Sequence, residues 1–542
     1  MFRKVAVLVL CIAFFSVSAS AQDAKTVIAN ATTAMGSLNS ITYSGTAKDV
    51  AFQQCGPNST SVICQGMHDP MRPITNYVRV IDLAGPTSRH GGATMNAPGG
   101  GATGPPAAGT FFAQVTPQQT DVAQPWTANS VEFYITPWGF LKGAAANNAT
   151  ASRRRLDGKN YTVLSWMPTS KAPSGANYVV NGWVNEQNMV ERVETWLGDN
   201  LMGDMQILAL YTDWKDFGGV KAPAKIVQTR GGWPFFEVTV TGAKGNPPDV
   251  ATLVPAPPPA AGRGGGGAPP AGGGRGAPAA GAPPAGGGRG APAAAQGAPA
   301  GVGRGAPGAV PPVPGAAAPA AGGRGQAAAP TPPEKLGEGL WRTTNGYNSL
   351  IIDFKDYIMV LEAGGNEAQT IAMIAEAKRL VPNKPIRYVM NTHPHSDHTA
   401  GLPTMVAEGA TIITHKNNEE FFERALSTPR TLLTDTLAKN PKKVKVETVG
   451  DKRTYSDGTR VVEFHHVPGA PHSNGLMIAY IPKEKVLFQG DFSVNPGQPA
   501  NDHVKALVPV LEKLNLDFDR YINVHAPAAP QTKKDVWASV GK

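Results

Sequence analysis

Cysteine is scarce in this chain of 542 residues, which contains only three. Cys11 lies in an apolar run near the N-terminus, and Cys55 and Cys64 lie close together in the sequence. In an oxidising compartment, a disulfide between Cys55 and Cys64 would stabilise the fold by about 2–3 kcal/mol, although two free thiols remain the alternative. Neither residue lies near the histidine cluster described below, so we do not expect a cysteine to bind a metal.

Long hydrophobic runs are also scarce, and the longest is Val5–Val17. It follows the charged pair Arg3-Lys4 and precedes the small residues Ser18-Ala19-Ser20-Ala21. This order is typical of a secretory signal peptide, here residues 1–21, with cleavage after Ala21. The alternative is a membrane anchor, but the run is shorter than the ~20 residues needed to span a bilayer. We therefore expect a secreted or periplasmic protein with no transmembrane segment after the signal is removed.

A strong basic surface is not expected either, although the formal net charge is +9. Two of these positive charges, Arg3 and Lys4, leave with the signal peptide, and five arginines lie in a low-complexity tract without acidic residues. A charge of about +2 then remains for the folded parts. Because so small an excess does not attract phosphates, we expect a small-molecule substrate and no nucleic-acid partner.

Large apolar side chains are almost missing from residues 251–335, which consist mainly of proline, alanine and glycine. A decapeptide, AGGGRGAPAA, occurs at 271–280 and again at 285–294. Such a segment cannot bury enough apolar surface to offset the entropy of ordering, so the composition predicts a disordered linker. Similar Gly-Arg repeats occur in RNA-binding tails, but in an exported protein we favour a spacer between two domains.

The first of these domains, residues 22–250, is rich in strand signals. Tyr178–Val184 and Met189–Trp196 flank the polar segment 185–188, which predicts a β-hairpin. Residues 85–109 are poor in large apolar side chains and predict a flexible loop. Consecutive short strands predict an antiparallel β-rich domain, loosely similar to the periplasmic lipoprotein-carrier folds. The other predicted strands are 40–47, 77–83, 161–166, 207–214, 224–229 and 235–241.

The second domain, residues 336–542, alternates predicted strands and helices. Residues 349–354 and 357–362 form a predicted hairpin, and 366–380 have the apolar spacing of a helix. The strand 386–391 follows directly. This mixed order predicts an α/β fold. Further strands are predicted at 411–414, 461–466, 476–481, 486–489 and 521–524, and helices at 417–426 and 504–514.

A dense group of polar side chains follows the strand 386–391. His393, His395, Asp397 and His398 lie within six residues of one another. Imidazole nitrogen and carboxylate oxygen are suitable zinc ligands, and histidines two apart in an extended loop can face one ion. A polar loop with scattered histidines is the alternative, but the density of the group favours a metal site.

This group resembles the His-x-His-x-Asp-His signature of the metallo-β-lactamase superfamily, which includes metallo-β-lactamases and glyoxalase II. The resemblance covers about residues 336–542 and implies an αβ/βα sandwich with the metal site at a sheet edge. It also implies three further ligands, which are His472, Asp491 and His525.

By the same resemblance, two zinc ions per chain are expected. The first would be held by His393, His395 and His472, and the second by Asp397, His398 and His525. Asp491 and a water would lie between them. Asp397 would also be catalytic, because it would orient the metal-bound hydroxide that attacks the substrate.

The sequence therefore predicts an exported zinc-dependent hydrolase of an ester, thioester, amide or lactam, or phosphoester. A β-lactamase is one version, but the enzymes of that kind that use cysteine in the second site would need cysteine in place of Asp491. They also use a lysine where this chain has Val494. The alternative is a ligand- or envelope-binding protein whose N-terminal β domain carries the main role. The sequence indicates neither the substrate nor the oligomeric state.

Overall fold

The structure is a computed structural model, and it describes residues 23–49, 71–94, 113–115, 126, 128–253, 332–344, 347–470, 472–495, 497–525 and 530–542. The signal peptide, Cys55, Cys64 and nearly all of the predicted linker lie outside these ranges. Those predictions therefore stay predictions. The described residues before and after the linker belong to one compact unit.

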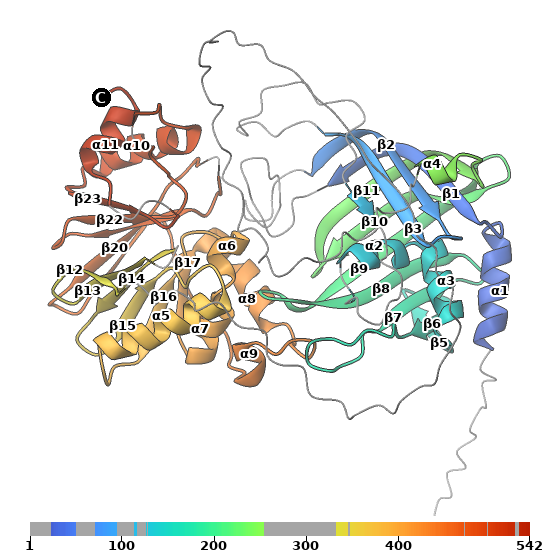
Figure 1. The fold of residues 1–542 in the computed structure, drawn as a ribbon, viewed down its shortest axis with the longest axis horizontal. Coiled ribbons are helices and arrows are strands. Elements are labelled where there is room, and N and C mark those ends of the chain that lie inside the picture. The colour runs from blue at the N-terminus through green and yellow to red at the C-terminus, as the bar shows by residue number, and fades with distance from the viewer. Residues whose placement is uncertain are drawn as a thin grey trace, which may run out of the picture. The chain divides into compact units, whose positions relative to one another are not determined.

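The N-terminal part contains a single sheet of eleven strands in the order β4-β3-β2-β1-β11-β10-β9-β8-β7-β6-β5 (Figure 1). Neighbouring strands are antiparallel throughout, which confirms the predicted fold class. In β9 the burial alternates residue by residue over its first half, as a sheet with one covered face requires. The strands are β1 Ser40–Asp49, β2 Arg72–Asp82, β3 Thr87–Thr94, β4 Ala113–Val115, β5 Thr150–Leu156, β6 Lys159–Trp166, β7 Val180–Val184, β8 Val190–Asp199, β9 Gly203–Asp216, β10 Lys221–Arg230 and β11 Trp233–Gly245.

Among the described residues of this part, four helices accompany the sheet, although the sequence analysis predicted strands alone. They are α1 Ala24–Ala34, α2 Ala128–Tyr134, α3 Pro137–Ala146 and α4 Val250–Leu253. The side chain of Thr136 caps α3 by accepting from the backbone N–H of Gly139. Gly182 of β7 lets α3 approach closely, since a Cβ there would lie 2.1 Å from Phe140 Cε1. The prediction of a loop at 85–109 is wrong over Thr87–Thr94, where β3 pairs with β2.

The C-terminal part contains two sheets. The first has seven strands in sequence order, antiparallel from β12 to β15 and parallel from β15 to β18. The second has five strands, of which β22 and β23 are parallel. The strands are β12 Glu334–Gly337, β13 Leu340–Thr344, β14 Asn348–Asp353, β15 Ile358–Leu361, β16 Ile386–Met390, β17 Thr411–His415, β18 Val446–Val449, β19 Lys452–Ser456, β20 Val461–His466, β21 Met477–Ile481, β22 Val486–Gln489 and β23 Arg520–Asn523.

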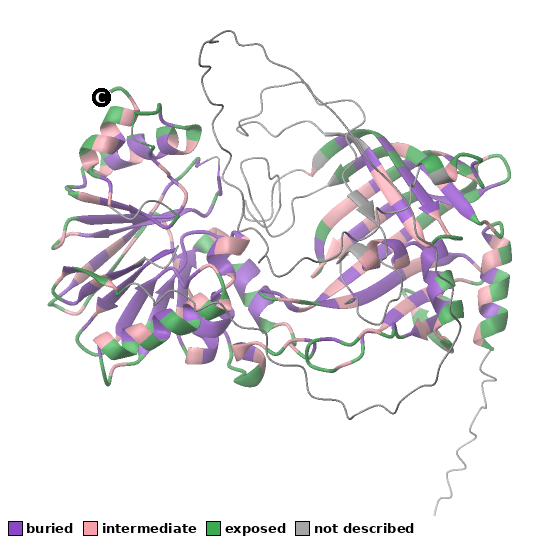
Figure 2. Ribbon diagram, viewed as in Figure 1, coloured by how far each residue is buried: buried purple, intermediate pink, exposed green. Residues whose placement is uncertain are grey.

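One apolar core joins these two sheets and includes Met390 and Ile413 of the first and Phe464 and Phe488 of the second. Helices cover the outer faces, with α5 and α7 beside the first sheet and α10 and α11 beside the second (Figure 1). Most strand residues are buried, whereas α5 and α10 have exposed sides (Figure 2). This is the predicted αβ/βα sandwich. The helices are α5 Glu367–Leu380, α6 Ser396–Thr399, α7 Leu402–Glu408, the 3-10 turn η1 Lys416–Asn418, α8 Glu419–Ser427, α9 Thr436–Lys439, α10 Asp502–Leu514 and α11 Lys533–Ser539.

Within the described ranges, every helix is too short or too polar to cross a bilayer.

Candidate metal centre

The histidine-rich loop begins where the buried strand β16 ends. His393 and His395 lie in extended backbone and are almost fully buried. His395 then precedes the single helical turn α6, which carries Asp397 and His398. The loop is held in place from within, because Thr399 Oγ1 donates to the carbonyl of His395 at 2.9 Å and Asn391 Nδ2 donates to that of His398 at 3.1 Å. Hydrogen bonds within the loop therefore hold the backbone that carries the four candidate ligands His393, His395, Asp397 and His398.

The other three predicted ligands also follow strand ends, but those of the second sheet. His472 lies between β20 and β21, Asp491 two residues after β22, and His525 two residues after β23. The structure brings all seven residues together at one edge of the sandwich. They fall into two groups, each contributed by both sheets: His393, His395, His472 and Asp491, and then Asp397, His398 and His525.

Asp491 lies between these two groups. Its Oδ2 is 2.5 Å from His472 Nε2 and 3.4 Å from His393 Nε2. Its Oδ1 is 3.1 Å from the Nε2 atoms of both His398 and His525. One carboxylate oxygen therefore faces each group, which is the arrangement that a bridging ligand needs.

The ring nitrogens in each group converge. His472 Nε2 lies 3.1 Å from His393 Nε2, and His525 Nε2 lies 2.9 Å from His398 Nε2. The buried His395 Nε2 has no hydrogen-bond partner in the described part of the chain. Converging nitrogens and a carboxylate form a donor set that zinc accepts, so the residues fit the metal that the resemblance implies.

The pKa values of two histidines in the first group, His393 and His395, favour neutral imidazoles. Burial, and next the nearby His398, lower the pKa of His393 to about 4. Burial and the charge of His393 place the pKa of His395 well below its ordinary value. Neutral imidazole is the form that binds metal, so these two side chains need lose no proton at neutral pH.

In the second group, the pKa values of the two histidines, His398 and His525, are raised, which favours their protonated forms. Burial lowers the pKa of His398, but Asp491 and Glu362 outweigh burial and hold it well above the ordinary value. Burial also opposes protonation of His525, yet hydrogen bonds to Asp397 and Asp491 raise its pKa to about 9. The carboxylates around this group therefore stabilise a cation, whether an imidazolium or a metal ion.

Two further residues orient His398, and the sequence analysis missed both in this role. Glu362 is fully buried, and its Oε2 lies 3.4 Å from His398 Nδ1 while its Oε1 accepts from the backbone N–H of Thr392 at 2.6 Å. Tyr347 donates its hydroxyl to Glu362 Oε2 at 2.9 Å and lies 3.1 Å from His398 Nδ1. A carboxylate behind a ligating histidine fixes the ring and leaves the other nitrogen for the metal.

The fold places Glu362 at the same edge as the histidine loop. It directly follows β15, which pairs with β16 in parallel, so both strands deliver their next residues to the same edge. Its backbone φ of 63° is in the left-handed region, which is uncommon outside glycine. Strain held at a buried carboxylate is typical of a functional position.

Close packing restricts the residue before Asp491. A Cβ on Gly490 would lie 2.7 Å from Thr392 Oγ1 and 3.2 Å from His393 Cε1. Thr392 Oγ1 in turn lies 2.9 Å from His393 Nδ1. Glycine is therefore needed at 490 for Asp491 and His393 to occupy their places together.

The remaining histidines of this domain lie outside the two groups. His415 and His466 stack on each other with ring centroids 3.9 Å apart. His465 is hydrogen-bonded to Glu463. His503 alone approaches the centre, where it packs edge-on against His472 with centroids 4.9 Å apart.

Residues 342–540 match the model of the Metallo-beta-lactamase superfamily. This part of the chain is thus a metallo-β-lactamase superfamily domain, which confirms the resemblance inferred from the histidine motif. The match does not extend to the N-terminal sheet.

Solved structures similar to this chain include metallo-β-lactamases from Pontibacter korlensis and Hirschia baltica. Their identities are 18% and 21%, they align with 39% of this chain and with 96% and 97% of their own, and both TM-scores are 0.29. The stereoselective inverting sec-alkylsulfatase Pisa1 from Pseudomonas sp. is 18% identical over 39% of this chain and 40% of its own, with a TM-score of 0.29. The family assignment rests on the match to residues 342–540.

Proposed function

We propose that this chain is an exported zinc-dependent hydrolase of a small molecule that contains an ester, thioester, amide or lactam, or phosphoester bond. The observation that carries the proposal is Asp491, whose two oxygens face two separate groups of histidines. Export is supported by the signal-peptide pattern of residues 1–21.

The donor set suits two zinc ions, and bound zinc lowers the pKa of a coordinated water to about 7. His393, His395 and His472 would hold one ion, and Asp397, His398 and His525 the other. The Asp397 and His525 side chains are 45% and 36% exposed, so the second group is the side open to substrate. The other side of the centre is closed by buried histidines.

Asp397 is suited to accept a hydrogen bond from an attacking water and so to orient it. Burial raises its pKa, but the hydrogen bond from His525 and the charges of His398 and His525 together outweigh burial and bring the pKa down to about 2. The side chain is therefore ionised at neutral pH and acts as an acceptor. Its Oδ2 lies 3.2 Å from His525 Nε2, which limits its freedom to turn away.

Among these substrates, we do not favour a β-lactam that needs a lysine to hold its carboxylate. Val494, which stands at that position, is 3% exposed and packs in the apolar core beside α10. It offers no positive charge to the centre.

Metal analysis of the full-length protein, together with a substrate panel of lactams, lactones, thioesters and phosphodiesters, tests this proposal. We expect two zinc equivalents per chain and hydrolysis of at least one class. Asp491→Ala should lower zinc occupancy and reduce the rate by about a hundredfold or more, because losing a ligand exceeds the effect of losing an orienting group.

Asp517→Ala is the matched control, since Asp517 is exposed and pairs only with Lys485. It should leave both occupancy and rate unchanged. A single bound metal in the wild type, with rate and occupancy unaffected in Asp491→Ala, would refute the two-metal model.

A further inference from the structure

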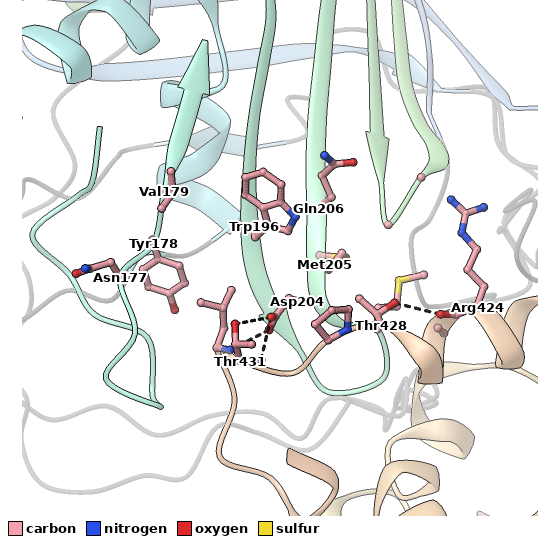
Figure 3. Close-up of a pocket in the computed structure, with 16 residues that line it drawn as sticks. Asn177, Tyr178, Val179, Trp196, Asp204, Met205, Gln206, Arg424, Thr428 and Thr431 are labelled. Carbon is pink, nitrogen blue, oxygen red and sulfur yellow. Dashed lines mark hydrogen bonds between the residues drawn. The ribbon is translucent and has the colours of Figure 1, made fainter. Parts of the chain in front are cut away.

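A second cavity, separate from the metal centre, has a volume of about 510 Å³ and contains none of the seven candidate ligands. It lies beside β8 and β9 of the N-terminal sheet and beside α8 and the segment that follows it (Figure 3). Its volume falls in the range of sites that hold small organic molecules.

The walls of this cavity combine polar side chains with an apolar part. Tyr178 and Trp196 contribute aromatic rings, and Met202 and Met205 contribute flexible thioether side chains. Leu432 completes the apolar lining from the other side. Rings offer flat surfaces for stacking, and methionine adapts to the outline of a ligand, so these walls suit a flat apolar body.

The carboxylate in the cavity lining, that of Asp204, already accepts hydrogen bonds from neighbouring residues. The Asp204 carboxylate accepts from Thr431 N at 2.8 Å, from Thr431 Oγ1 at 2.6 Å and from Leu432 N at 2.9 Å (Figure 3). These three donors satisfy the carboxylate and hold the segment after α8 against the start of β9. Asp204 therefore forms part of the frame and is not available to a cationic ligand.

The arginine of the lining, Arg424, forms no ion pair with a described carboxylate. Arg424 of α8 is the other charged residue of the lining, and no carboxylate within the described ranges lies at ion-pair distance from it. Its guanidinium lies 4.4 Å from the centre of the Trp233 ring. Gly232 makes room for it, because a Cβ there would collide with the guanidinium.

We propose that this cavity binds an organic anion with a flat apolar body, whose carboxylate, phosphate or sulfate group pairs with Arg424. The apolar part would lie along Trp196 and Tyr178. Arg424 supplies a forked set of donors that matches such oxyanions. Binding here is independent of the hydrolytic site, because the two share no residue.

The competing explanation is a gap between packed elements that holds only solvent. The two explanations differ in how they predict that binding depends on the charge of the ligand. A solvent-filled gap shows no preference between an anionic and a neutral ligand of the same shape, whereas the proposed site depends on the guanidinium.

Calorimetric titration of the full-length protein with naphthalenesulfonate, and with neutral naphthalenemethanol for comparison, tests the proposal. We expect saturable binding of the sulfonate and at least tenfold weaker binding of the alcohol. Arg424→Gln should weaken the sulfonate by about tenfold or more and leave the alcohol unchanged. Trp196→Ala should weaken both probes.

Arg387→Gln is the matched control, because Arg387 is also an exposed arginine beside aromatic rings, those of Tyr357 and Tyr388, and lies outside this cavity. It should change neither titration. Treatment with a chelator should also leave sulfonate binding intact. Absence of saturable binding, equal affinity in Arg424→Gln, or loss of binding on chelation would each overturn the proposal.

Discussion

Replacing Glu362 with glutamine tests whether a buried carboxylate sets the metal affinity of the second group. The side chain is fully buried and satisfies three neighbours: the Thr392 amide, the Tyr347 hydroxyl and His398 Nδ1. Glutamine has nearly the same shape but carries no charge, and only one of its two terminal atoms accepts hydrogen bonds. One of the donors therefore meets an NH₂ group instead of an oxygen.

The expected effect follows from these contacts. Hydrogen bonds to a charged group contribute about 1.5–3 kcal/mol each, and removing an orienting partner of a metal-binding histidine weakens metal affinity by about 10–100-fold. We expect Glu362→Gln to weaken one of the two zinc equivalents by that factor and to leave the other close to its wild-type affinity. Competition with a zinc chelator, read as two binding steps, measures both.

Glu463→Gln is the matched control, because Glu463 Oε2 also lies 3.0 Å from a histidine nitrogen, that of His465, which is in neither group. It should leave both zinc affinities unchanged. If both variants weakened zinc binding equally, or if Glu362→Gln lowered only the melting temperature, the assigned role of Glu362 would be wrong.

Three further predictions concern stability and packing. Burial, and next the charge of Arg79, lower the pKa of His90 to about 4, so the unfolded chain binds a proton below about pH 6.5 that the folded chain does not. Stability should therefore fall from pH 6.5 to pH 4, and thermal melts of His90→Gln should show a shallower fall; an equally steep fall would exclude His90 as the cause. Asp204→Ala should lower the free energy of unfolding by about 1–3 kcal/mol, because it removes three hydrogen bonds, and should speed hydrogen exchange at the Thr431 amide; unchanged exchange would contradict the contact. Gly490→Ala should reduce zinc occupancy nearly as much as loss of Asp491, as elemental analysis would show, since its Cβ would lie 2.7 Å from Thr392 Oγ1; normal occupancy would mean that the loop yields easily.

The ligand set could be predicted because its members follow short apolar strands in a recognisable order. His393, His395, Asp397 and His398 are contiguous, so the sequence alone places them on one loop. His472, Asp491 and His525 were predicted through the resemblance to the metallo-β-lactamase superfamily, and the structure brings all three to the same edge. The first four are detectable locally, from their chemical type and their position just after a strand, whereas the other three are detectable only through the family motif.

The orienting residues could not be found in this way. Glu362 reads as the last residue of a strand, and Tyr347 lies in a loop before the motif. Their role depends on the parallel pairing of β15 with β16 and on the approach of Tyr347 to His398, which are contacts between distant segments. No spacing within the sequence encodes either contact.

The helices of the N-terminal part were missed for a related reason. Residues 137–146, which form α3, include two glycines and two aromatic residues, which favour a helix only weakly, although Pro137 stands at the first position, where proline is well tolerated. The helix is stabilised by what it covers, with Phe140 against Gly182 and Gly143 against Trp166. Tertiary packing thus overrides weak local preference, and it cannot be read before the sheet is known.

The two groups of candidate ligands each join the two sheets of the C-terminal domain, which has a consequence for the order of folding. His393 and His472 are 79 residues apart in the chain, and His398 and His525 are 127 apart. Neither group can assemble until the two sheets have packed together, so the polypeptide must complete most of its folding before either complete group can hold a metal ion. A cation bound there would then close two long loops at once, and by opposing separation of the sheets it would act as a late cross-link that slows unfolding more than it speeds folding.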